Sequence, residues 1–370
     1  MKLLFGLFNY FPYGGLERDM LTVALVCQAR GHDVTIYTEH WQGAKPANTR
    51  IIELPGRGLT NHGRAAVFIK QFQQVIAENP DSRVVGFNKM PGLDFYYAAD
   101  VCFAEKAYEE RSWFYRIMPR CKTYLSFEAA VFGRENKTRV LMISKAQTGV
   151  YQKYYQTPDE RMYLLPPGIR RDRCMPDHYA TQRQELRAAY KLGQDDKVMI
   201  MVGSDYRRKG LDRALHGIAA LDKKMRDKTY LWVIGQDDKT PFVKLARDLG
   251  IEKNISFLGA RDDVSQLLWT ADALIHPAYS ENTGTVLLEG VVAGLPVISS
   301  RACGYSYYIE ENELGCVIEE PVSAKTVAKA VSRVFSVDQN VWQKRCGSFA
   351  QTADIYSMPE RFAEYIEKHG

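Results

Sequence analysis

One stretch of the chain, residues 273–298, constrains its fold more than any other. It begins with the apolar residues 273–275, which predict a buried strand, and continues into a polar turn at residues 279–282. Residues 284–293 then predict an apolar helix, and residues 297–298 open a further strand. A strand, a turn, a helix and a strand in this order are the repeating unit of a parallel sheet covered by helices. The chain is therefore expected to contain an α/β domain.

Two glutamates lie where such a unit binds its ligands. In parallel sheets, ligands bind beyond the carboxyl ends of the strands, where the N-termini of helices offer free N–H groups. Glu281 falls in the turn at that end, and Glu289 follows along the helix, for which Thr283 is the predicted N-cap. Both glutamates could instead be solvated or capping carboxylates of an ordinary unit, so the pair alone does not identify a function.

The rest of the chain alternates strands and helices in two runs. Its 370 residues are enough for two domains of roughly 150 to 190 residues each. The first run opens with a strand at residues 3–8, a helix at residues 16–29 and a strand at residues 34–37, and the second run begins with a strand at residues 198–202. Residues 166–168 (PPG) predict the hinge between the two domains.

Composition excludes several classes of protein. The net charge of +5 is compatible with an anionic partner but too small to indicate nucleic-acid binding. The seven cysteines form no CxxC pair and no cluster with metal-binding spacing, which is typical of reduced intracellular thiols. No apolar run approaches the ~20 residues of a membrane span. The apolar residues 1–8 are too short for a signal peptide and are interpreted as the first strand.

A pair of glycines, Gly14 and Gly15, leads from the first predicted strand into the helix at residues 16–29. A loop without side chains lets backbone N–H groups approach a phosphate, although a tight turn is an equally good interpretation of these residues alone. The loop lacks the pattern GxGxxG, which argues against a dinucleotide-binding dehydrogenase.

A basic turn follows the strand at residues 198–202. Arg208 and Lys209 place a planar fork and a compact charge at the carboxyl end of that strand, where an anion would bind. Cations fixed in such a turn would stabilise negative charge on a bound ligand. The pattern DxD, typical of a metal-held diphosphate, does not occur. A solvated basic turn is the alternative, and Arg173 is either a further cation of this site or a surface arginine of the linker.

Residues 111–124 (RSWFYRIMPRCKTY) combine cations with large aromatics and contain no acid. Such a segment can lie in the plane of an anionic bilayer, with its aromatics at headgroup depth and its cations on phosphates. The residues assigned to this membrane contact are Arg111, Trp113, Phe114, Arg116, Arg120 and Lys122. The alternative is core packing with a solvated basic edge, and Pro119 is expected to interrupt a regular helix.

The pattern around the two glutamates resembles that of a known family. A strand ending in His276-Pro277, the spacing Glu281-x7-Glu289 and the sequence AGLPV at residues 293–297 resemble the carboxyl half of the family-4 retaining glycosyltransferases, which have the GT-B fold. Further segments look like the lipopolysaccharide core glucosyltransferases, so that the resemblance covers essentially the whole chain. These segments are residues 11–16 (FPYGGL), 60–64 (TNHGR), 84–94 (VVGFNKMPGLD), 165–169 (LPPGI) and 303–305 (CGY).

The resemblance implies an α/β chain of the GT-B class, in which two doubly wound, Rossmann-like domains face each other across a cleft. Residues 1–165 would form an acceptor-binding and membrane-facing domain, and residues 166–350 a domain that binds the nucleotide sugar. Residues 351–370 would form a helix that crosses back to the first domain.

The resemblance also implies roles for the candidate residues. Arg208 and Lys209 would contact the diphosphate and Glu281 the sugar. Asp100 stands where many relatives carry a histidine that contacts the transferred sugar, and Asp19 would face the same cleft; a helix cap and an exposed helical carboxylate are the respective alternatives. The implied donor-binding residues are Gly14, Gly15, Arg173, Gly235, Ala260, Arg261, Asn282, Thr283, Gly284, Thr285, Val286 and Glu289, the last on the ribose hydroxyls. His276 has no assigned role.

The activity implied is retaining transfer of a hexose, glucose in the first place, from a UDP-sugar to inner-core heptose on lipid A–core. The UDP-sugar is a substrate, and neither a cofactor nor a metal ion is expected. The protein would act in the cytoplasm, peripherally on the inner face of the bacterial inner membrane, where residues 111–124 meet an anionic surface. A nucleotide-sugar epimerase of the same fold and a non-enzymatic UDP-sugar-binding protein remain as alternatives. A glycoside hydrolase is disfavoured, because a basic turn does not serve an acid–nucleophile pair.

Overall fold

The structure is a computed structural model that describes residues 1–12, 14–176 and 179–370. It divides into two compact units: unit 1 comprises Met1–Gly168 and Tyr356–Gly370, and unit 2 comprises Ile169–Ile355. The divisions fall a few residues beyond the boundaries predicted after residues 165 and 350. Residue 13, in the predicted glycine loop, lies outside the described residues.

Unit 1 is built on a seven-stranded sheet in which every neighbouring pair of strands is parallel. The strands are β1 (Lys2–Tyr10), β2 (Asp33–Trp41), β3 (Arg50–Glu53), β4 (Arg83–Gly86), β5 (Phe95–Ala98), β6 (Arg139–Met142) and β7 (Met162–Leu164). Their order is β3-β2-β1-β4-β5-β6-β7. The chain moves outward from β1 and then returns to the other side of β1, so the strand order reverses between β1 and β4. Ligands of doubly wound sheets bind at such a point.

Helices cover both faces of this sheet. They are α1 (Gly15–Ala29), α2 (Asn61–Ala77), α3 (Phe103–Glu105), the π-helix η1 (Lys106–Glu110), α4 (Trp113–Ile117), α5 (Pro119–Phe132), α6 (Lys145–Tyr155), the 3-10 helix η2 (Asp159–Arg161) and α16 (Met358–His369). One apolar layer joins the sheet to α1 and α16, and another joins it to α2, α5 and α6. Because both faces are covered, strands such as β1 are apolar along most of their length instead of alternating.

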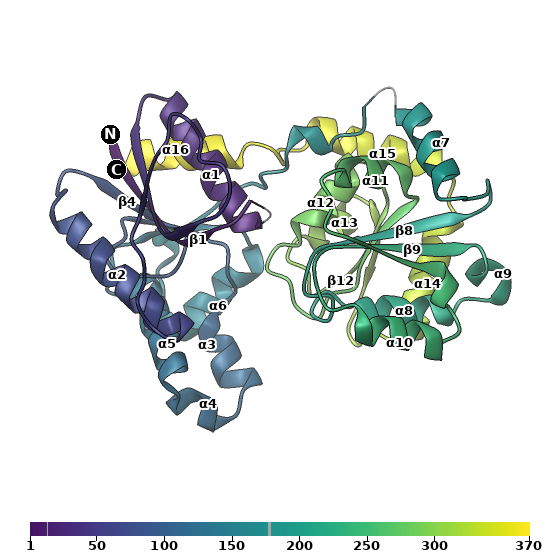
Figure 1. Cartoon of the computed structure of the whole chain (residues 1–370), viewed down its shortest axis with the longest axis horizontal. Helices are drawn as coiled ribbons and strands as arrows, with labels where there is room; N and C mark the ends of the chain where they lie inside the picture. Colours follow the sequence, from purple (N-terminus) through teal and green to yellow (C-terminus); the bar gives the residue numbers. More distant parts are fainter. Residues whose placement is uncertain (13, 177–178) are drawn as a thin grey trace. The chain divides into compact units, whose positions relative to one another are not determined.

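The last helix of the chain belongs to unit 1, where α16 lies beside α1 (Figure 1). Its apolar stripe includes Phe362 and Ile366, both fully buried in the layer beneath α1. Burying a phenylalanine or isoleucine side chain stabilises a fold by about 1.5–3 kcal/mol. Glu367 adds a surface ion pair with Arg30, at 2.6 Å.

Unit 2 repeats the same plan with a six-stranded, all-parallel sheet of order β10-β9-β8-β11-β12-β13. The strands are β8 (Lys197–Val202), β9 (Thr229–Ile234), β10 (Ile255–Gly259), β11 (Ala273–His276), β12 (Val297–Ser300) and β13 (Gly315–Ile318). Here the strand order reverses between β8 and β11. The loops after these two strands therefore leave the sheet side by side.

The helical elements of unit 2 are η3 (Arg171–Arg173), α7 (Tyr179–Ala189), α8 (Leu211–Ala219), α9 (Lys223–Arg226), α10 (Thr240–Asp248), η4 (Glu252–Asn254), α11 (Val264–Thr270), α12 (Thr285–Val292), α13 (Ser306–Glu311), α14 (Ala324–Phe335) and α15 (Gln339–Thr352). Figure 1 shows α8, α10 and α14 on one side of β8 and β9, with α11 and α12 on the other. The layer under α8, α10 and α14 is one large apolar cluster that includes Leu215, Phe242 and Val331.

Several local predictions need correction. The helix predicted at residues 284–293 begins at Thr285, and its N-cap is Gly284 instead of Thr283. The edge strands β3 and β13 were not predicted, and neither were the helices α3, α5, α6, α7, α9, α13 and α15. Pro119 separates α4 from α5, as predicted, and occupies the first turn of α5, where a proline loses no helical hydrogen bond. None of the described helices combines the length and hydropathy needed to cross a membrane.

Candidate active site

The candidate site of unit 2 forms where the loop after β8 meets the loop after β11. Gly210 makes this approach close: its φ is +77°, and a Cβ atom there would lie 2.1 Å from the Pro277 carbonyl oxygen. Only glycine suits both conditions. The Tyr279 N–H also donates to the Arg208 carbonyl at 2.8 Å. The basic turn and the turn that carries Glu281 are thereby joined through their backbones.

The predicted basic pair and the first glutamate come together in this site. Lys209 Nζ lies 3.0 Å and Arg208 Nη1 3.1 Å from the same oxygen, Oε2 of Glu281. The side chains of Lys209 and Glu281 are only 14% and 15% exposed. Lys209 runs directly over Gly203, where a Cβ atom would lie 2.6 Å from its Cε. The glycine at the exit of β8 therefore makes room for the lysine.

His276 completes the surroundings of Glu281, although the sequence assigned it no role. Its ring is fully buried, and Nε2 lies 3.5 Å from Glu281 Oε2. Burial lowers the pKa of His276, so the imidazole is neutral at physiological pH. Burial also acts to raise the pKa of Glu281, but contact with His276 and the charges of Lys209 and Arg208 outweigh it and hold that pKa well below its usual range. Glu281 is therefore an ionised carboxylate.

The loop around Glu281 is fixed by backbone bonds to residues 302–305. Glu281 N–H donates to the Ala302 carbonyl, and the Gly304 and Tyr305 N–H groups donate to the carbonyls of Glu281 and Thr283. Beyond this loop, α12 begins with Gly284 in the left-handed region, at φ +73°. The predicted donor-contacting residues 282–286 thus form the N-terminus of α12, where free N–H groups favour an anion.

Glu289, on the second turn of α12, is paired with Arg173. Arg173 Nε lies 3.6 Å from Glu289 Oε1, and both side chains are nearly buried. Arg173 Nη1 also donates to Ser265 Oγ at 2.9 Å, and its carbonyl accepts from Trp269 Nε1. The sequence offered Arg173 as a further cation of the donor site or as a surface arginine of the linker; its side chain is only 12% exposed, which excludes the second, and it lies beside the predicted donor residue Glu289.

The remaining predicted donor residues of unit 2 lie at the ends of β9 and β10. Gly235 has φ +144°, and a Cβ atom there would be 2.5 Å from the Gly203 carbonyl oxygen, so this glycine allows the exits of β8 and β9 to converge. Ala260 is exposed after β10. Arg261 is bound through two nitrogens by Asp263, which the sequence did not indicate.

The predicted residues of unit 1 lie at the carboxyl edge of its sheet. Two of them, Asp19 and Asp100, belong to an acidic group there. Gly14 is the N-cap of α1, and the space around Gly15 is open. Asp19, on the second turn of α1, accepts a hydrogen bond from Tyr97 Oη at 2.8 Å. Asp100 follows β5, and the N-cap of α3 is Cys102, so Asp100 does not cap that helix.

Glu17 is a member of this acidic group that the sequence analysis missed. Its side chain is buried against Gly14, and burial, followed by the charges of Asp100 and Asp19, raises the pKa of Glu17 to about 7. A glutamate in the first turn of a helix is usually a solvated carboxylate that stabilises the helix through its interaction with the helix dipole. Its position in the sequence therefore gave no sign of burial.

The basic aromatic segment is exposed. Trp113 and Phe114, on α4, are 61% and 60% exposed, and their rings stack at 3.8 Å. Core packing, the alternative interpretation, is therefore wrong for these two residues. Arg116 instead supports the segment from within, since its guanidinium donates to the Ala107 and Tyr108 carbonyls. Arg111, Arg120 and Lys122 are exposed.

Two Rossmann-like units, with an Arg–Lys turn that contacts Glu281 in the loop before the helix of Glu289, define a nucleotide-sugar-dependent glycosyltransferase of the GT-B class. Residues 182–353 match the model of the family described as glycosyl transferases group 1. The chain is 41% identical over 368 residues to the lipopolysaccharide glucosyltransferase WaaG of Escherichia coli K12, covering 99% of this chain and 98% of that protein. The chain belongs to the group 1 glycosyltransferase family.

Solved structures agree with this assignment. A crystal structure of WaaG, described as a glycosyltransferase involved in lipopolysaccharide biosynthesis, superposes with a TM-score of 0.92 at 41% identity over 98% of this chain and 99% of its own. Anabaena HepE, solved with UDP and glucose, shares the fold over the full length of both chains, with a TM-score of 0.77 at 18% identity. A second relative by sequence, a GDP-mannose-dependent phosphatidylinositol monomannoside mannosyltransferase of Mycobacterium tuberculosis, is 30% identical over 88% of this chain and 87% of its own length.

Proposed function

We propose that this glycosyltransferase moves glucose from UDP-glucose to an inner-core heptose of lipopolysaccharide, with retention of the anomeric configuration and without a metal ion. The observation that carries the proposal is the ionised Glu281 held by Lys209, Arg208 and His276 at the N-terminus of α12. It occurs in a chain that is 41% identical, throughout its length, to a lipopolysaccharide glucosyltransferase.

The donor's diphosphate suits the basic turn and the N-terminus of α12. Arg208 and Lys209 offer two fixed charges, and α12 offers N–H groups and the positive end of its dipole. As the glycosidic bond breaks, negative charge collects on the leaving diphosphate, and cations that are already in place stabilise it without reorganisation. These two side chains supply the charge that a metal ion would otherwise supply.

Glu281 and Glu289 suit the two sugar rings of the donor. Ionised carboxylates accept hydrogen bonds from hydroxyl groups, so Glu281 would orient the hexose and Glu289 the ribose. Arg173 would hold Glu289 in the orientation that this requires. The acceptor hydroxyl would attack the face from which the diphosphate departs, with no covalent enzyme intermediate.

The acceptor suits the acidic group of unit 1. Asp19 and Asp100 present carboxyl groups at the carboxyl edge of the sheet, where a heptose can be held through its hydroxyls.

The direct test is transfer from a panel of labelled UDP-hexoses to lipopolysaccharide truncated at heptose, with EDTA present throughout. Labelled lipid from UDP-glucose, undiminished by EDTA, is expected. Activity that EDTA abolishes and Mg²⁺ or Mn²⁺ restores would contradict the metal-free proposal. Transfer from a different UDP-hexose would correct the sugar. Epimerised donor without transfer, or UDP binding without any product, would overturn the function.

We further propose that the protein acts peripherally at the inner face of the bacterial inner membrane, through α4 and the start of α5. The support is an exposed apolar surface surrounded by cations: Trp113, Phe114, Ile117 and Met118 are each more than half exposed. Large exposed apolar groups are costly in water and mark a contact site, and neighbouring cations favour an anionic bilayer.

Removing this apolar surface is expected to weaken binding to vesicles rich in anionic phospholipid. The variant Trp113→Ser/Phe114→Ser should lose binding to these anionic vesicles. The variant Arg111→Gln/Arg120→Gln/Lys122→Gln should lose at least about tenfold in affinity, because each cation near the surface contributes ~1 kcal/mol. Leu25→Ser, at an exposed leucine on α1, is the control and should bind normally. Vesicle sedimentation measures the affinities, and equal binding by all four proteins would contradict the proposed contact.

A further inference from the structure

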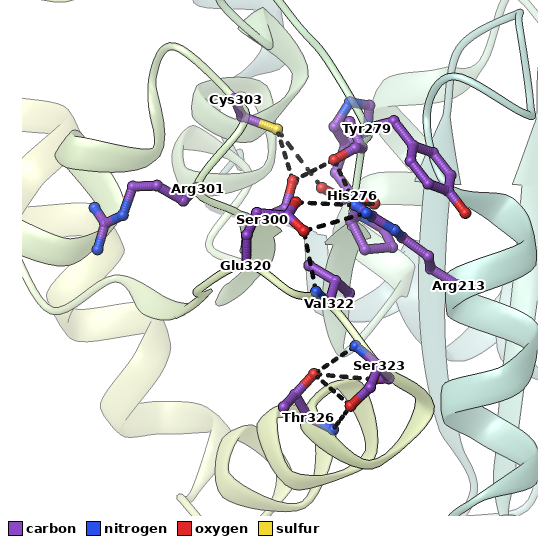
Figure 2. Close-up of polar contacts among 12 residues, drawn as sticks. Arg213, His276, Tyr279, Ser300, Arg301, Cys303, Glu320, Val322, Ser323 and Thr326 are labelled. Atoms are coloured by element: carbon purple, nitrogen blue, oxygen red, sulfur yellow. Dashed lines mark hydrogen bonds and ion pairs between the residues drawn. The ribbon is translucent and has the colours of Figure 1, made fainter.

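The loop that carries Glu281 is held from below by Arg213, on the first turn of α8. Its Nη1 donates to the carbonyls of Pro277 and Ala278, at 3.3 and 3.0 Å. Its two terminal nitrogens also pair with both carboxylate oxygens of Glu320, at 3.2 and 3.3 Å. Figure 2 shows Arg213 reaching from α8 toward Glu320 beneath this loop. The arginine thus fixes the backbone three to four residues before Glu281.

The Tyr279 side chain packs against Arg213. Its ring centroid lies 3.7 Å from the central carbon of the Arg213 guanidinium, a close cation–π contact. Its hydroxyl donates to Asp212 Oδ2 at 2.7 Å. Through its N–H, the same residue holds the Arg208 carbonyl. Tyr279 therefore connects the loop of Glu281 to α8 and to the basic turn.

We call the packing of Arg213 against Tyr279, together with the bonds of Arg213 to the carbonyls of Pro277 and Ala278, the brace. The brace lies between the two charged groups of the candidate site. Arg208 and Lys209 precede α8 directly, since α8 begins at Leu211, and Glu281 follows Tyr279 by two residues. A change in the packing of Arg213 against Tyr279 would therefore change the separation of the basic pair from Glu281. The far end of the brace is itself fixed, because Glu320 also accepts from the Val322 N–H at 3.0 Å. Ser300 Oγ holds the Ala278 carbonyl from the opposite side (Figure 2).

We propose that Arg213 and Tyr279 are positioning residues for the transfer reaction, which set the distance between Glu281 and the Arg208–Lys209 pair. The inference rests on the proposed function of this site. Catalysis by oriented charges is sensitive to displacements of about 1 Å, which can reduce turnover by ~10²-fold. Binding of the nucleotide should be less sensitive, because Arg213 and Tyr279 contact neither Glu289 nor the exit of β9.

The test compares kcat, KM for the UDP-sugar, Kd for UDP and melting temperature across matched variants. Arg213→Gln and Tyr279→Leu are each expected to lower kcat by at least about tenfold, with the Kd for UDP little changed. Tyr279→Phe keeps the ring over Arg213 and loses only the bond from the hydroxyl to Asp212, so it should lose much less kcat than Tyr279→Leu. The double variant should have a kcat only slightly lower than that of either single variant, because each substitution already removes the same brace. Arg247→Gln removes an exposed ion pair with Glu252 and is the control for loss of an arginine.

The possible outcomes distinguish a positioning role from a purely structural role and from direct contact with the substrate. A lower melting temperature with unchanged kcat below the transition would overturn the inference in favour of a purely structural role. Loss of kcat in Tyr279→Phe equal to that in Tyr279→Leu would overturn it in favour of direct contact between the hydroxyl and substrate. Normal kcat in Arg213→Gln would overturn it alone, while the proposed function stands. Absence of transfer by the unmodified protein would overturn the proposed function and this inference together.

Discussion

Replacing Glu281 with glutamine is expected to lower kcat for sugar transfer by about 10²- to 10³-fold, the loss typical of removing one preorganised electrostatic contact. The substitution keeps the size of the side chain and removes the charge that Lys209, Arg208 and His276 surround. The affinity for UDP should hold or rise, because both cations lose their carboxylate partner and can pair with the diphosphate. Labelled transfer gives kcat, and calorimetry gives the Kd for UDP.

Glu313→Gln is the matched control, since it removes an exposed carboxylate of the same unit from a distant ion pair with Arg345. It should leave both quantities unchanged. If Glu281→Gln turned over normally, Glu281 would have no part in the reaction. If UDP affinity fell in proportion to kcat, Glu281 would act in binding the donor and not in the transition state.

The arrangement of the donor site could be predicted where it follows from strand order. Arg208 and Lys209 follow β8, and Glu281 follows β11, and both positions were evident from apolar strands ended by polar turns. That β8 and β11 are neighbours is a property of doubly wound sheets, in which the strand order reverses at the binding edge. The resemblance to a GT-B family supplied this topology, and the sheet order agrees with it.

What could not be predicted depends on burial that local sequence does not encode. His276 looks like any histidine at a strand end, and its contact with Glu281 exists only because β11 is fully covered. The pairing of Arg173 with Glu289 joins residues that are distant in the chain. The helix α7 was missed because none of its described residues is buried, so it has no apolar stripe of helical period. The strand β3 was missed because it lies at the edge of the sheet, where two charged, exposed residues flank only two apolar ones and no apolar run forms.

For the glycines, too, the sequence did not predict roles that depend on backbone angles or on contacts with other loops. Gly284 was assigned to the helix and Thr283 to its cap, because threonine is a favoured N-cap and the sequence gives no backbone angle. In the structure, the left-handed φ of Gly284 turns the chain from the Glu281 loop into α12. Gly210 had no predicted role, since the Pro277 carbonyl that excludes a side chain there lies in another loop.

Replacing Lys209 with alanine is expected to lower kcat by more than tenfold, which corresponds to a barrier increase above ~1.4 kcal/mol. The lysine lies over Gly203, with its ammonium 3.0 Å from Glu281, so it is held in place before the donor arrives. A fixed cation contributes most when the charge on the departing diphosphate is greatest, which is in the transition state. The loss should therefore be larger in kcat than in the Kd for UDP.

Two further variants separate the position of the charge from its presence. Lys209→Arg keeps the charge but replaces a compact ammonium by a wider planar group, so it should recover only part of the lost kcat. Lys228→Ala removes a lysine of unit 2 that pairs with Asp196 on the surface, and should have no effect. Unchanged turnover in Lys209→Ala would exclude this lysine from the mechanism, and Arg208 would then be the cation that stabilises the leaving group. Full activity of Lys209→Arg would mean that the charge alone is required, and that the space Gly203 leaves for the lysine stem has no part in catalysis.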